Sequence, residues 1–391
     1  MKKIVLSVAA GLALLTASAT AQEKAIKIGF VSTFSGPTAA IGNDMRNSFE
    51  LALDHLGRKM YGLPVRVIYE DDQQKPEVGR QKTQKLVESD KVDFVAGYIW
   101  SNVLLASVKP VLDADAFLIS AQAGPSSLAG PQCSKNLFLS ASQNEQHPEA
   151  MGEYMNRKRI KSVFLIGPNY AAGHDSLSGV KRTFKGKIVD EVYTKWPDQL
   201  DFSAELSRAR AAKPDAIFAF YPGAAGVQFL KQYTQSGLKG QIPLYTVATI
   251  DEISLPLQKE NALGVLGMQQ WANDIPNEQN KKFVADYRAK YPGLRPTYFG
   301  AFSYDIVGLI NSAIVAVKGD LTNKEGIRNA LHKADFKSVR GPFKFGNNNV
   351  PIENEYLLEV VKDNSGELSL KTVDVLKDRH DSYASQCPLT W

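Results

Sequence analysis

The chain has 391 residues, of which 44% are hydrophobic and 22% charged, so a disordered or collagen-like protein is excluded. This length favours about two domains. The net charge of +5, from 46 basic and 41 acidic residues, is small and not clustered, so we expect no nucleic-acid partner.

The first 21 residues have the pattern of a secretory signal peptide. Lys2 and Lys3 give a positive start, a mostly apolar stretch covers 4–15, and small residues end the segment at Ala21. The apolar stretch is shorter than the ~20 residues of a membrane-spanning helix. We therefore expect cleavage after Ala21, no later membrane span, and export to a bacterial periplasm.

The chain holds two cysteines, Cys133 and Cys387. In an oxidising compartment such a pair predicts one disulfide, which would tie the C-terminal tail to a loop near residue 133. A free reactive thiol is the alternative. A metal site would need more ligands than this pair offers nearby.

Short runs rich in Val, Ile and Phe alternate with helical patterns in the first part of the chain. Apolar residues three or four apart predict a helix from Ile41 to Leu56, and a shorter helix is expected around 78–87. This alternation predicts βαβ units and a parallel sheet. The expected strands are 26–32, 65–70, 92–97 and 117–121.

The same alternation restarts at residue 162 and predicts a second α/β lobe. The most apolar helix, 304–317, follows the second set of strands, and we expect it to pack back on the first lobe. The chain would then cross between the lobes several times. The expected strands are 162–167, 188–193, 216–221 and 244–247, and the other expected helices are 176–184, 226–236 and 278–291.

An antiparallel pair of strands is predicted near the end of the chain, at 341–345 and 355–361. Gly346 and the three asparagines that follow it form the expected turn between them.

Common catalytic motifs are absent from the sequence. It has no phosphate-binding loop, no dinucleotide-binding glycine pattern, no zinc-protease motif and no nucleophile elbow. The five histidines have no metal-ligand spacing, and we interpret the acidic run 70–72 as a solvated strand end. We expect no catalytic residue, metal or cofactor, although a triad assembled from distant residues stays open.

Residues 26–56, IKIGFVSTFSGPTAAIGNDMRNSFELALDHL, resemble the opening of type I periplasmic solute-binding proteins. These are the leucine/isoleucine/valine-binding group of ABC importers. Further segments resemble this family in order along nearly all of the mature chain. They are 65–72, 92–101, 119–124, 167–176, 221–226 and 244–255.

The resemblance implies an α/β fold of two Rossmann-like lobes, joined by a three-crossing hinge, and no catalysis. The N-terminal lobe would contain 22–142 and 273–341, the C-terminal lobe 143–272 and 342–375, and 376–391 would form a tail. It also implies a monomer that delivers a small-molecule ligand to the permease subunits of an ABC transporter.

In this resemblance the ligand lies in the cleft, beyond the carboxyl ends of the strands. Ser101 matches a residue whose hydroxyl and amide meet a ligand carboxylate. Ile41 matches an aromatic wall position, and Tyr170 matches a tyrosine of the second lobe. The expected binding residues are Ile41, Trp100, Ser101, Gln122, Ala123, Gly124, Tyr170, Tyr221, Gly223 and Thr249.

Two departures from the family bear on the ligand. Gly124 replaces a hydroxyl residue, and Ala248 or Thr249 stands where amino-acid binders carry an acid for the ligand ammonium. An ammonium buried without a carboxylate is costly.

Aromatic residues near the site favour a ligand with a ring, because offset and edge-on ring contacts are favourable. We therefore predict an aromatic carboxylate, such as a benzoate or phenylpropenoid. The residues that would supply this lining are Tyr98, Trp100, Tyr170, Phe220 and Tyr221.

Three alternatives stay open. A branched-chain or other amino-acid binder would be favoured if Asp251 or Glu252 reached the pocket. A secreted hydrolase would require a Ser–His–acid or metal cluster in the cleft. A sensor domain for a membrane receptor would bind ligand without transporting it.

Overall fold

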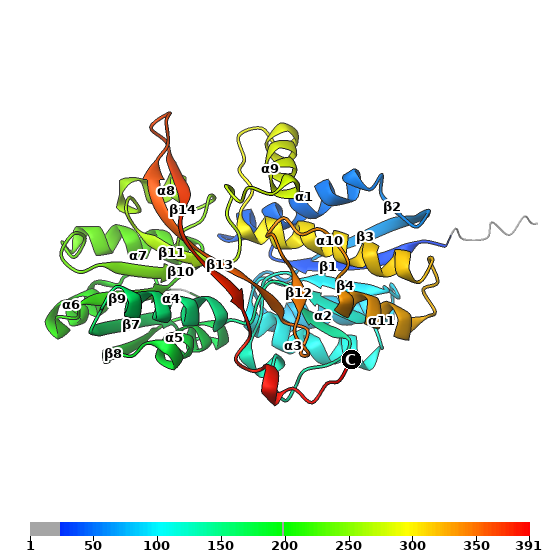
Figure 1. The fold of residues 1–391 in the computed structure, drawn as a ribbon, viewed down its shortest axis with the longest axis horizontal. Coiled ribbons are helices and arrows are strands. Elements are labelled where there is room, and N and C mark those ends of the chain that lie inside the picture. Colours follow the sequence, from blue (N-terminus) through cyan, green and yellow to red (C-terminus); the bar gives the residue numbers. More distant parts are fainter. Residues whose placement is uncertain (1–23, 198) are drawn as a thin grey trace, which may run out of the picture.

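Figure 1 shows the computed structural model, which describes residues 24–197 and 199–391. Two α/β lobes lie side by side, each built on its own sheet (Figure 1). The predicted signal peptide, 1–21, lies outside the described residues.

The first lobe is built on a sheet with the strand order β2-β3-β1-β4-β5-β6. All neighbouring strands are parallel except β2 and β3. The four strands predicted for this part are all present. The strands are β1 (Ile26–Ser32), β2 (Lys59–Met60), β3 (Leu63–Asp71), β4 (Phe94–Gly97), β5 (Phe117–Ser120) and β6 (Leu137–Leu139), and the helices between them are α1 (Ala39–His55), α2 (Pro76–Glu88), α3 (Ser101–Asp113) and a 3₁₀ turn, Ser126–Leu128.

The second sheet has the order β12-β13-β11-β10-β9-β7-β8, with β14 paired to β13. Strands β7 to β11 are parallel, whereas β12, β13 and β14 pair antiparallel. The strands are β7 (Ser162–Pro168), β8 (Lys187–Thr194), β9 (Ala216–Phe220), β10 (Leu244–Val247), β11 (Leu266–Gln269), β12 (Lys344–Phe345), β13 (Pro351–Lys362) and β14 (Leu368–Arg379).

Helices of the later chain cover both lobes. Those that follow β6 to β10 are α4 (Gln146–Arg157), α5 (Ala171–Thr183), α6 (Ser203–Ala212), α7 (Ala224–Gln235) and α8 (Leu255–Gln258), with a 3₁₀ turn at Lys259–Asn261. After β11 come α9 (Glu278–Lys290), α10 (Tyr298–Ala316) and α11 (Lys324–Lys333), and Ala384–Gln386 forms a last 3₁₀ turn.

Helix α10 packs against α1 and α11 on the first lobe, as expected. It begins at Tyr298 rather than at the predicted residue 304, because Thr297 caps it and its hydroxyl accepts a hydrogen bond from the amide of Phe299. Among the described helices, only α10 is long and apolar enough to cross a membrane. By length and composition, the expectation that no segment after the signal peptide is apolar enough to span a membrane was therefore wrong. Its most apolar window is 67% buried, as in a core helix.

The predicted antiparallel pair is present, since β12 pairs antiparallel with β13, but its register differs from the prediction. Strand β12 pairs only with Pro351 and Ile352 at the start of β13. The rest of β13 lies between β11 and β14. The sequence pattern did not reveal β14 because only Leu370 and Leu376 of this strand are buried, so it lacks the alternation of a half-buried strand.

The chain passes between the sheets after β6, after β11 and after α11. The wholly buried Arg340 lies in the third crossing and links it to the first crossing, α10 and β13. Its Nε donates to Asp305 of α10 at 2.9 Å, and its Nη1 lies 3.1 Å from Glu353 of β13. The same Nη1 donates to the carbonyl of Ala141, in the first crossing, at 3.2 Å.

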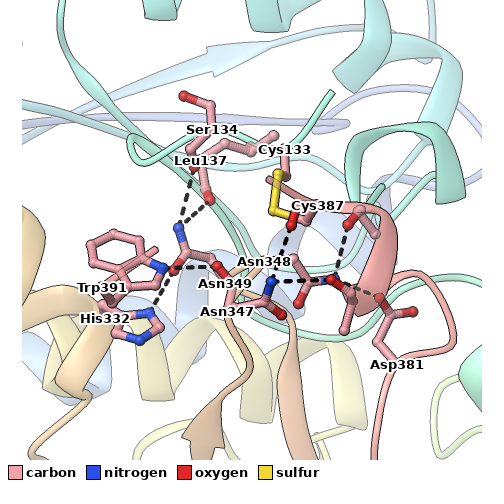
Figure 2. The surroundings of a disulfide bond; sticks show 12 residues. Cys133, Ser134, Leu137, His332, Asn347, Asn348, Asn349, Asp381, Cys387 and Trp391 are labelled. Atoms are coloured by element: carbon pink, nitrogen blue, oxygen red, sulfur yellow. Dashed lines mark hydrogen bonds between the residues drawn. A yellow bond between two sulfur atoms is a disulfide. The ribbon is translucent and has the colours of Figure 1, made fainter. Parts of the chain in front are cut away.

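The C-terminal tail returns from β14 to the first lobe, where Cys387 forms a disulfide with Cys133 (Figure 2). The C-terminal tail packs on the predicted turn at 346–349. The side-chain amide of Asn347 donates to the carbonyls of Ala384 and Cys387, and that of Asn349 donates to the carbonyls of Ser134 and Leu137 (Figure 2). The tail therefore adds a covalent link between the lobes.

We expect the Cys133→Ala/Cys387→Ala double variant to lose about 2–4 kcal/mol of unfolding free energy, because the disulfide closes a loop between residues 254 apart in sequence. Urea denaturation in oxidising buffer measures the loss. A reductant should lower the stability of the wild type by a similar amount and leave the variant unchanged. Equal stability of the two proteins in oxidising buffer would contradict a structural role.

Candidate ligand-binding site

A cavity lies between the lobes, and the empty space in and around it is about 580 Å³, which includes space open to solvent. Residues at or just after the carboxyl ends of β4, β5, β7, β9 and β10 line it, together with residues of the first two crossings. The lining consists of Ile99, Trp100, Ser101, Gln122, Ser142, Asn144, His147, Tyr170, Ala172, Ser176, Phe220, Pro222, Val247, Ala248, Met268, Gln269, Tyr298 and Phe299.

Aromatic rings from both lobes form one wall of the cavity. Tyr170 stacks face to face on Trp196, with ring centroids 4.4 Å apart. Trp196 also packs against Trp100 of the first lobe at 5.2 Å. Sequence reasoning missed Trp196, which follows β8 and holds the rings of the two lobes together.

A buried hydrogen-bond chain orients Trp100. Its Nε1 donates to the hydroxyl of Thr33 at 2.8 Å, and this hydroxyl donates to Asp72 at 2.5 Å. Asp72 is fully buried and Glu70 is 8% exposed, so the interpretation of 70–72 as a solvated strand end was wrong for these two residues. Burial raises the pKa of Asp72 to about 6. No group of three or more potential metal ligands occurs in the described part of the chain.

Polar groups gather where the N-terminal ends of α3 and α5 meet the cavity. The side-chain amide of Asn144 donates to the hydroxyl of Ser101 at 3.0 Å and to Asp175 at 2.8 Å. Asp175, on α5 of the second lobe, also accepts from the amide and hydroxyl of Ser126 of the first lobe. The helix ends supply partial positive charge, which suits an anionic ligand.

Among the described lining residues, which include no Lys or Arg, His147 is the one with a basic side chain. Its Nδ1 lies 2.7 Å from the buried carboxylate of Glu355, and its Nε2 lies 3.2 Å from the hydroxyl of Ser142. Glu355 also accepts from Gln270 at 3.1 Å. Sequence reasoning missed this cluster because His147 and Glu355 are 208 positions apart.

Of the ten predicted binding residues, the structure brings four to the cavity: Trp100, Ser101, Gln122 and Tyr170. Tyr221 instead lies in the core of the second lobe, where its hydroxyl meets Thr194 at 3.0 Å. The hydroxyl of Thr249 accepts from the amide of Tyr221 at 3.0 Å and does not face the cavity. Phe220 lines the cavity, whereas Tyr98 is directed to Thr83 in the first lobe.

The remaining four predicted residues surround the cavity without lining it. Ile41 and Gly223 face each other across the lobes, since a Cβ on Gly223 would lie 3.6 Å from Ile41. The amide of Ala123 donates to the carbonyl of Tyr98 at 3.0 Å. Gly124 is required for close packing, because an added Cβ would lie 1.8 Å from the carbonyl oxygen of Ser142.

Asp251 and Glu252 do not line this cavity, whereas Ala248 does. Asp251 accepts hydrogen bonds from Ile253 and Ser254 of its own loop.

Residues 25–366 match the family described as periplasmic binding protein. The chain belongs to the periplasmic binding protein family. It is a solute-binding protein of an ABC transporter.

Relatives of this periplasmic binding protein differ in the ligands that their names state. "Leu/Ile/Val-binding protein homolog 6" of Brucella melitensis is 27% identical over 97% of this chain and 98% of its own. A solute-binding protein of an ABC transporter from R. palustris, solved with benzoate, is 28% identical, with a TM-score of 0.87 over 94% of this chain and 100% of that one. A branched-chain amino acid transporter substrate-binding protein from Streptococcus pneumoniae, solved with isoleucine, is 25% identical, with a TM-score of 0.79 over 90% and 99%.

Sequence reasoning also missed Tyr298 and Phe299 as residues that line the cavity of this periplasmic binding protein. They lie in the first turn of α10, ahead of the predicted helix start. Recognition of Thr297 as an N-cap residue is the signal that could have found them.

We expect Asp72→Asn to stabilise this binding protein more at pH 7 than at pH 4. The native pKa of Asp72, about 6, lies above the usual 3.8. The free energy of unfolding of the wild type therefore falls as the pH rises through this interval, because the buried carboxyl loses its proton, whereas the neutral amide of the Asn variant causes no such loss. Urea denaturation at several pH values measures the difference from wild type.

Asp381→Asn is the matched control, because burial also raises the pKa of Asp381, in the C-terminal tail, to about 6. Both variants should show the pH effect. A difference in unfolding free energy between Asp72→Asn and wild type that stays constant from about pH 4 to 7 would contradict the raised pKa of Asp72.

Proposed function

We propose that this protein captures a small aromatic carboxylate, such as a benzoate, between its lobes and delivers it to the permease subunits of its transporter. The observation that carries this proposal is the composition of the cavity. Five aromatic side chains line it, and its described lining includes no Asp, Glu, Lys or Arg. These aromatic residues are Trp100, Tyr170, Phe220, Tyr298 and Phe299.

An α-amino acid fits this cavity poorly. Its ammonium group would meet Ala248, where amino-acid binders of the family are expected to carry an acid. Asp251 and Glu252 lie outside the lining and cannot replace that acid. The ammonium would lose its hydration without gaining a counter-charge, which is costly.

A carboxylate finds suitable partners at the polar end of the cavity. The hydroxyl of Ser101 accepts from Asn144, so its own proton is free to be donated to a ligand oxygen. The N-terminal turns of α3 and α5 add backbone amides, and His147 adds a group that can be cationic. These contacts supply the pairing that an arginine would otherwise provide.

The relatives support two ligand classes. The R. palustris structure with benzoate favours the aromatic acid. The S. pneumoniae structure with isoleucine makes a branched-chain amino acid the alternative. The absence of an acidic side chain from the described lining favours the aromatic acid.

Contacts across the cleft support capture by hinge closure. Trp196 of the second lobe packs on Trp100 of the first, and Asp175 accepts from Ser126. Opening the lobes would break both contacts, and a ligand that touches both lobes favours the closed form. We infer a monomer that acts in the periplasm after cleavage behind Ala21, with no catalytic step.

The serine, histidine and carboxylate of Ser142, His147 and Glu355 have the hydrogen-bond order of a hydrolase triad. We assign them a binding role, because an acyl-transfer site also needs free donors for an oxyanion. The amides after Ser142 are already used: that of Gln143 donates to Gln146 at 2.8 Å, and that of Asn144 donates to Gly124 at 2.7 Å.

We expect benzoate to raise the melting temperature of the mature protein, residues 22–391, and isoleucine to leave it unchanged. A ligand that binds only the native state stabilises it by mass action. Differential scanning fluorimetry with benzoates and with aliphatic amino acids at equal concentrations tests this. A shift with isoleucine alone would overturn the aromatic-acid proposal.

We expect Trp100→Ala to weaken benzoate binding at least about tenfold, because a large aromatic contact in a buried site would be lost. Calorimetric titration measures the affinity. Trp391→Ala is the matched control, since this tryptophan lies in the tail, stacked on His332, and should bind benzoate as the wild type does. Equal affinity of the two variants would remove Trp100 from the ligand wall.

A further inference from the structure

Asn144 lies in the first crossing, between β6 and α4, and its side chain lines the ligand cavity. Its side-chain nitrogen donates two hydrogen bonds, one toward each lobe. The acceptor at 3.0 Å is the hydroxyl of Ser101, the first residue of α3. The acceptor at 2.8 Å is the carboxylate of Asp175, on α5 of the second lobe. Asn144 therefore connects the predicted carboxylate-binding serine to the second lobe.

Two separate contacts fix the direction of the Asn144 side-chain amide. Its oxygen accepts from the backbone amide of Gly124 at 3.2 Å, and its nitrogen faces the carboxylate of Asp175. A reversed amide would place its oxygen against that carboxylate and its NH2 group against an N–H donor, so both hydrogen bonds would be lost. The backbone amide of Asn144 also donates to the carbonyl of Gly124 at 2.7 Å, which holds the residue from a second side. Asn144 is thus a donor, and not an acceptor, toward Ser101.

The glycine at position 124 makes room for this arrangement. An added Cβ at Gly124 would lie 1.8 Å from the carbonyl oxygen of Ser142 and 3.2 Å from the Cα atom of Gln143. The hydroxyl residue that the family resemblance implies at this position would therefore displace the segment that carries Asn144. The departure at Gly124 and the position of Asn144 at the cavity are two parts of one feature.

We propose that Asn144 is a positioning residue, which fixes the direction of the Ser101 hydroxyl and so selects an ionised carboxylate over a neutral group of the same shape. The inference rests on the proposed function for the contact between Ser101 and the ligand. A hydroxyl that accepts from Asn144 directs its own proton elsewhere, and no described residue accepts that proton. The ligand atom that meets Ser101 must then be an acceptor.

A carboxylate meets this requirement, and a primary amide does not. Both oxygens of a carboxylate accept, so one can face the Ser101 hydroxyl and the other the backbone amides at the start of α3 and α5. An amide of the same shape has one acceptor and one donor, so its NH2 group would face either Ser101 or the helix amides, all of which are donors. A site built to pair an acceptor strongly disfavours a donor there, because buried groups are left unpaired.

Asp175 holds the other end of this chain of hydrogen bonds. Besides accepting from Asn144, it accepts from the backbone amide of Ser126 at 3.0 Å and from its hydroxyl at 2.7 Å. Hydrogen bonds in a chain polarise one another, so a ligand that accepts from Ser101 strengthens the donation from Asn144. Asp175 and Ser126 belong to different lobes, and recognition of the ligand carboxylate therefore shares Asp175 with a contact across the cleft.

A double-mutant cycle on Asn144 and Ser101 tests the inference, measured by calorimetric titration of the mature protein, residues 22–391. We expect Asn144→Ala and Ser101→Ala each to weaken benzoate binding about tenfold, because each removes one hydrogen bond of the chain. The double variant should also lose about tenfold, since Asn144 acts through Ser101. Independent effects would instead multiply to about a hundredfold. That result, or unchanged affinity in folded Asn144→Ala, would overturn the proposal.

The neutral analogue benzamide gives a readout that a purely structural role would not move. Asn144→Ala should lower the preference for benzoate over benzamide at least about tenfold, because the released Ser101 hydroxyl can accept from the NH2 group. Weaker binding of both ligands by the same factor would contradict the positioning role.

Asn156→Ala is the matched control. This asparagine of α4 is also partly buried, and its side chain donates to the carbonyl of Thr183 and accepts from the amide of Lys185, each at 2.8 Å. It lies outside the cavity lining, so the variant should lose stability but bind benzoate as the wild type does. Asn144→Ser replaces Asn144→Ala in the cycle if the alanine variant fails to fold by circular dichroism.

The cycle separates this inference from the aromatic-acid proposal. If isoleucine rather than benzoate binds the wild type, the aromatic-acid proposal fails, and the same cycle with isoleucine and its amide tests Asn144, because only the ligand carboxylate is concerned. Binding of neither acid would overturn both proposals.

Discussion

The fold depends on the burial of one guanidinium group, that of Arg340. Removing a charge from water costs several kcal/mol unless its donors are paired. Arg340 has partners from three parts of the chain: Asp305 of α10, Glu353 of β13 and the carbonyl of Ala141. Its Nη2 has no hydrogen-bond partner among the described residues. The rings of Phe302 and Phe343 lie 4.8 and 4.7 Å from the guanidinium carbon. Loss of Asp305 or Glu353 would remove a counter-charge from the buried guanidinium, so the first and third crossings are held in one arrangement.

Strand β13 connects the hinge region around Arg340 to the ligand cavity. Alternate residues of a strand face the same side, so Glu353 and Glu355 of β13 lie next to each other on one face. Glu353 pairs with Arg340, whereas Glu355 holds His147 at the cavity. A hinge that kept these pairs during opening would leave His147 in place. The contacts between Asp175 and Ser126 and between Trp196 and Trp100 lie across the cleft and would be the ones to separate.

Buried parallel strands were the most predictable part of the fold. β1 and β10 were predicted to the residue, because a strand covered on both faces is a short apolar run between turn residues. β14 was missed because only two of its residues, Leu370 and Leu376, are buried. The predicted start of α10 was too late because its N-cap, Thr297, was not recognised. The site was predictable where it follows such strands, as at Trp100, Ser101 and Tyr170. His147 and Tyr298 reach the cavity, and Trp196 packs on its aromatic wall, through packing between distant segments, which one sequence does not reveal. The predicted lobe boundaries stay predictions.

The start of α10 joins the ligand cavity to the core of the first lobe. Tyr298 and Phe299 of its first turn line the cavity, and the amides of Thr297 and Gly300 donate to Asp44 of α1. A carboxylate at a helix N-terminus is stabilised by the helix dipole, and it fixes the backbone of that turn in return. The buried carboxylate of Asp44 therefore holds in place the turn that carries two aromatic walls of the cavity.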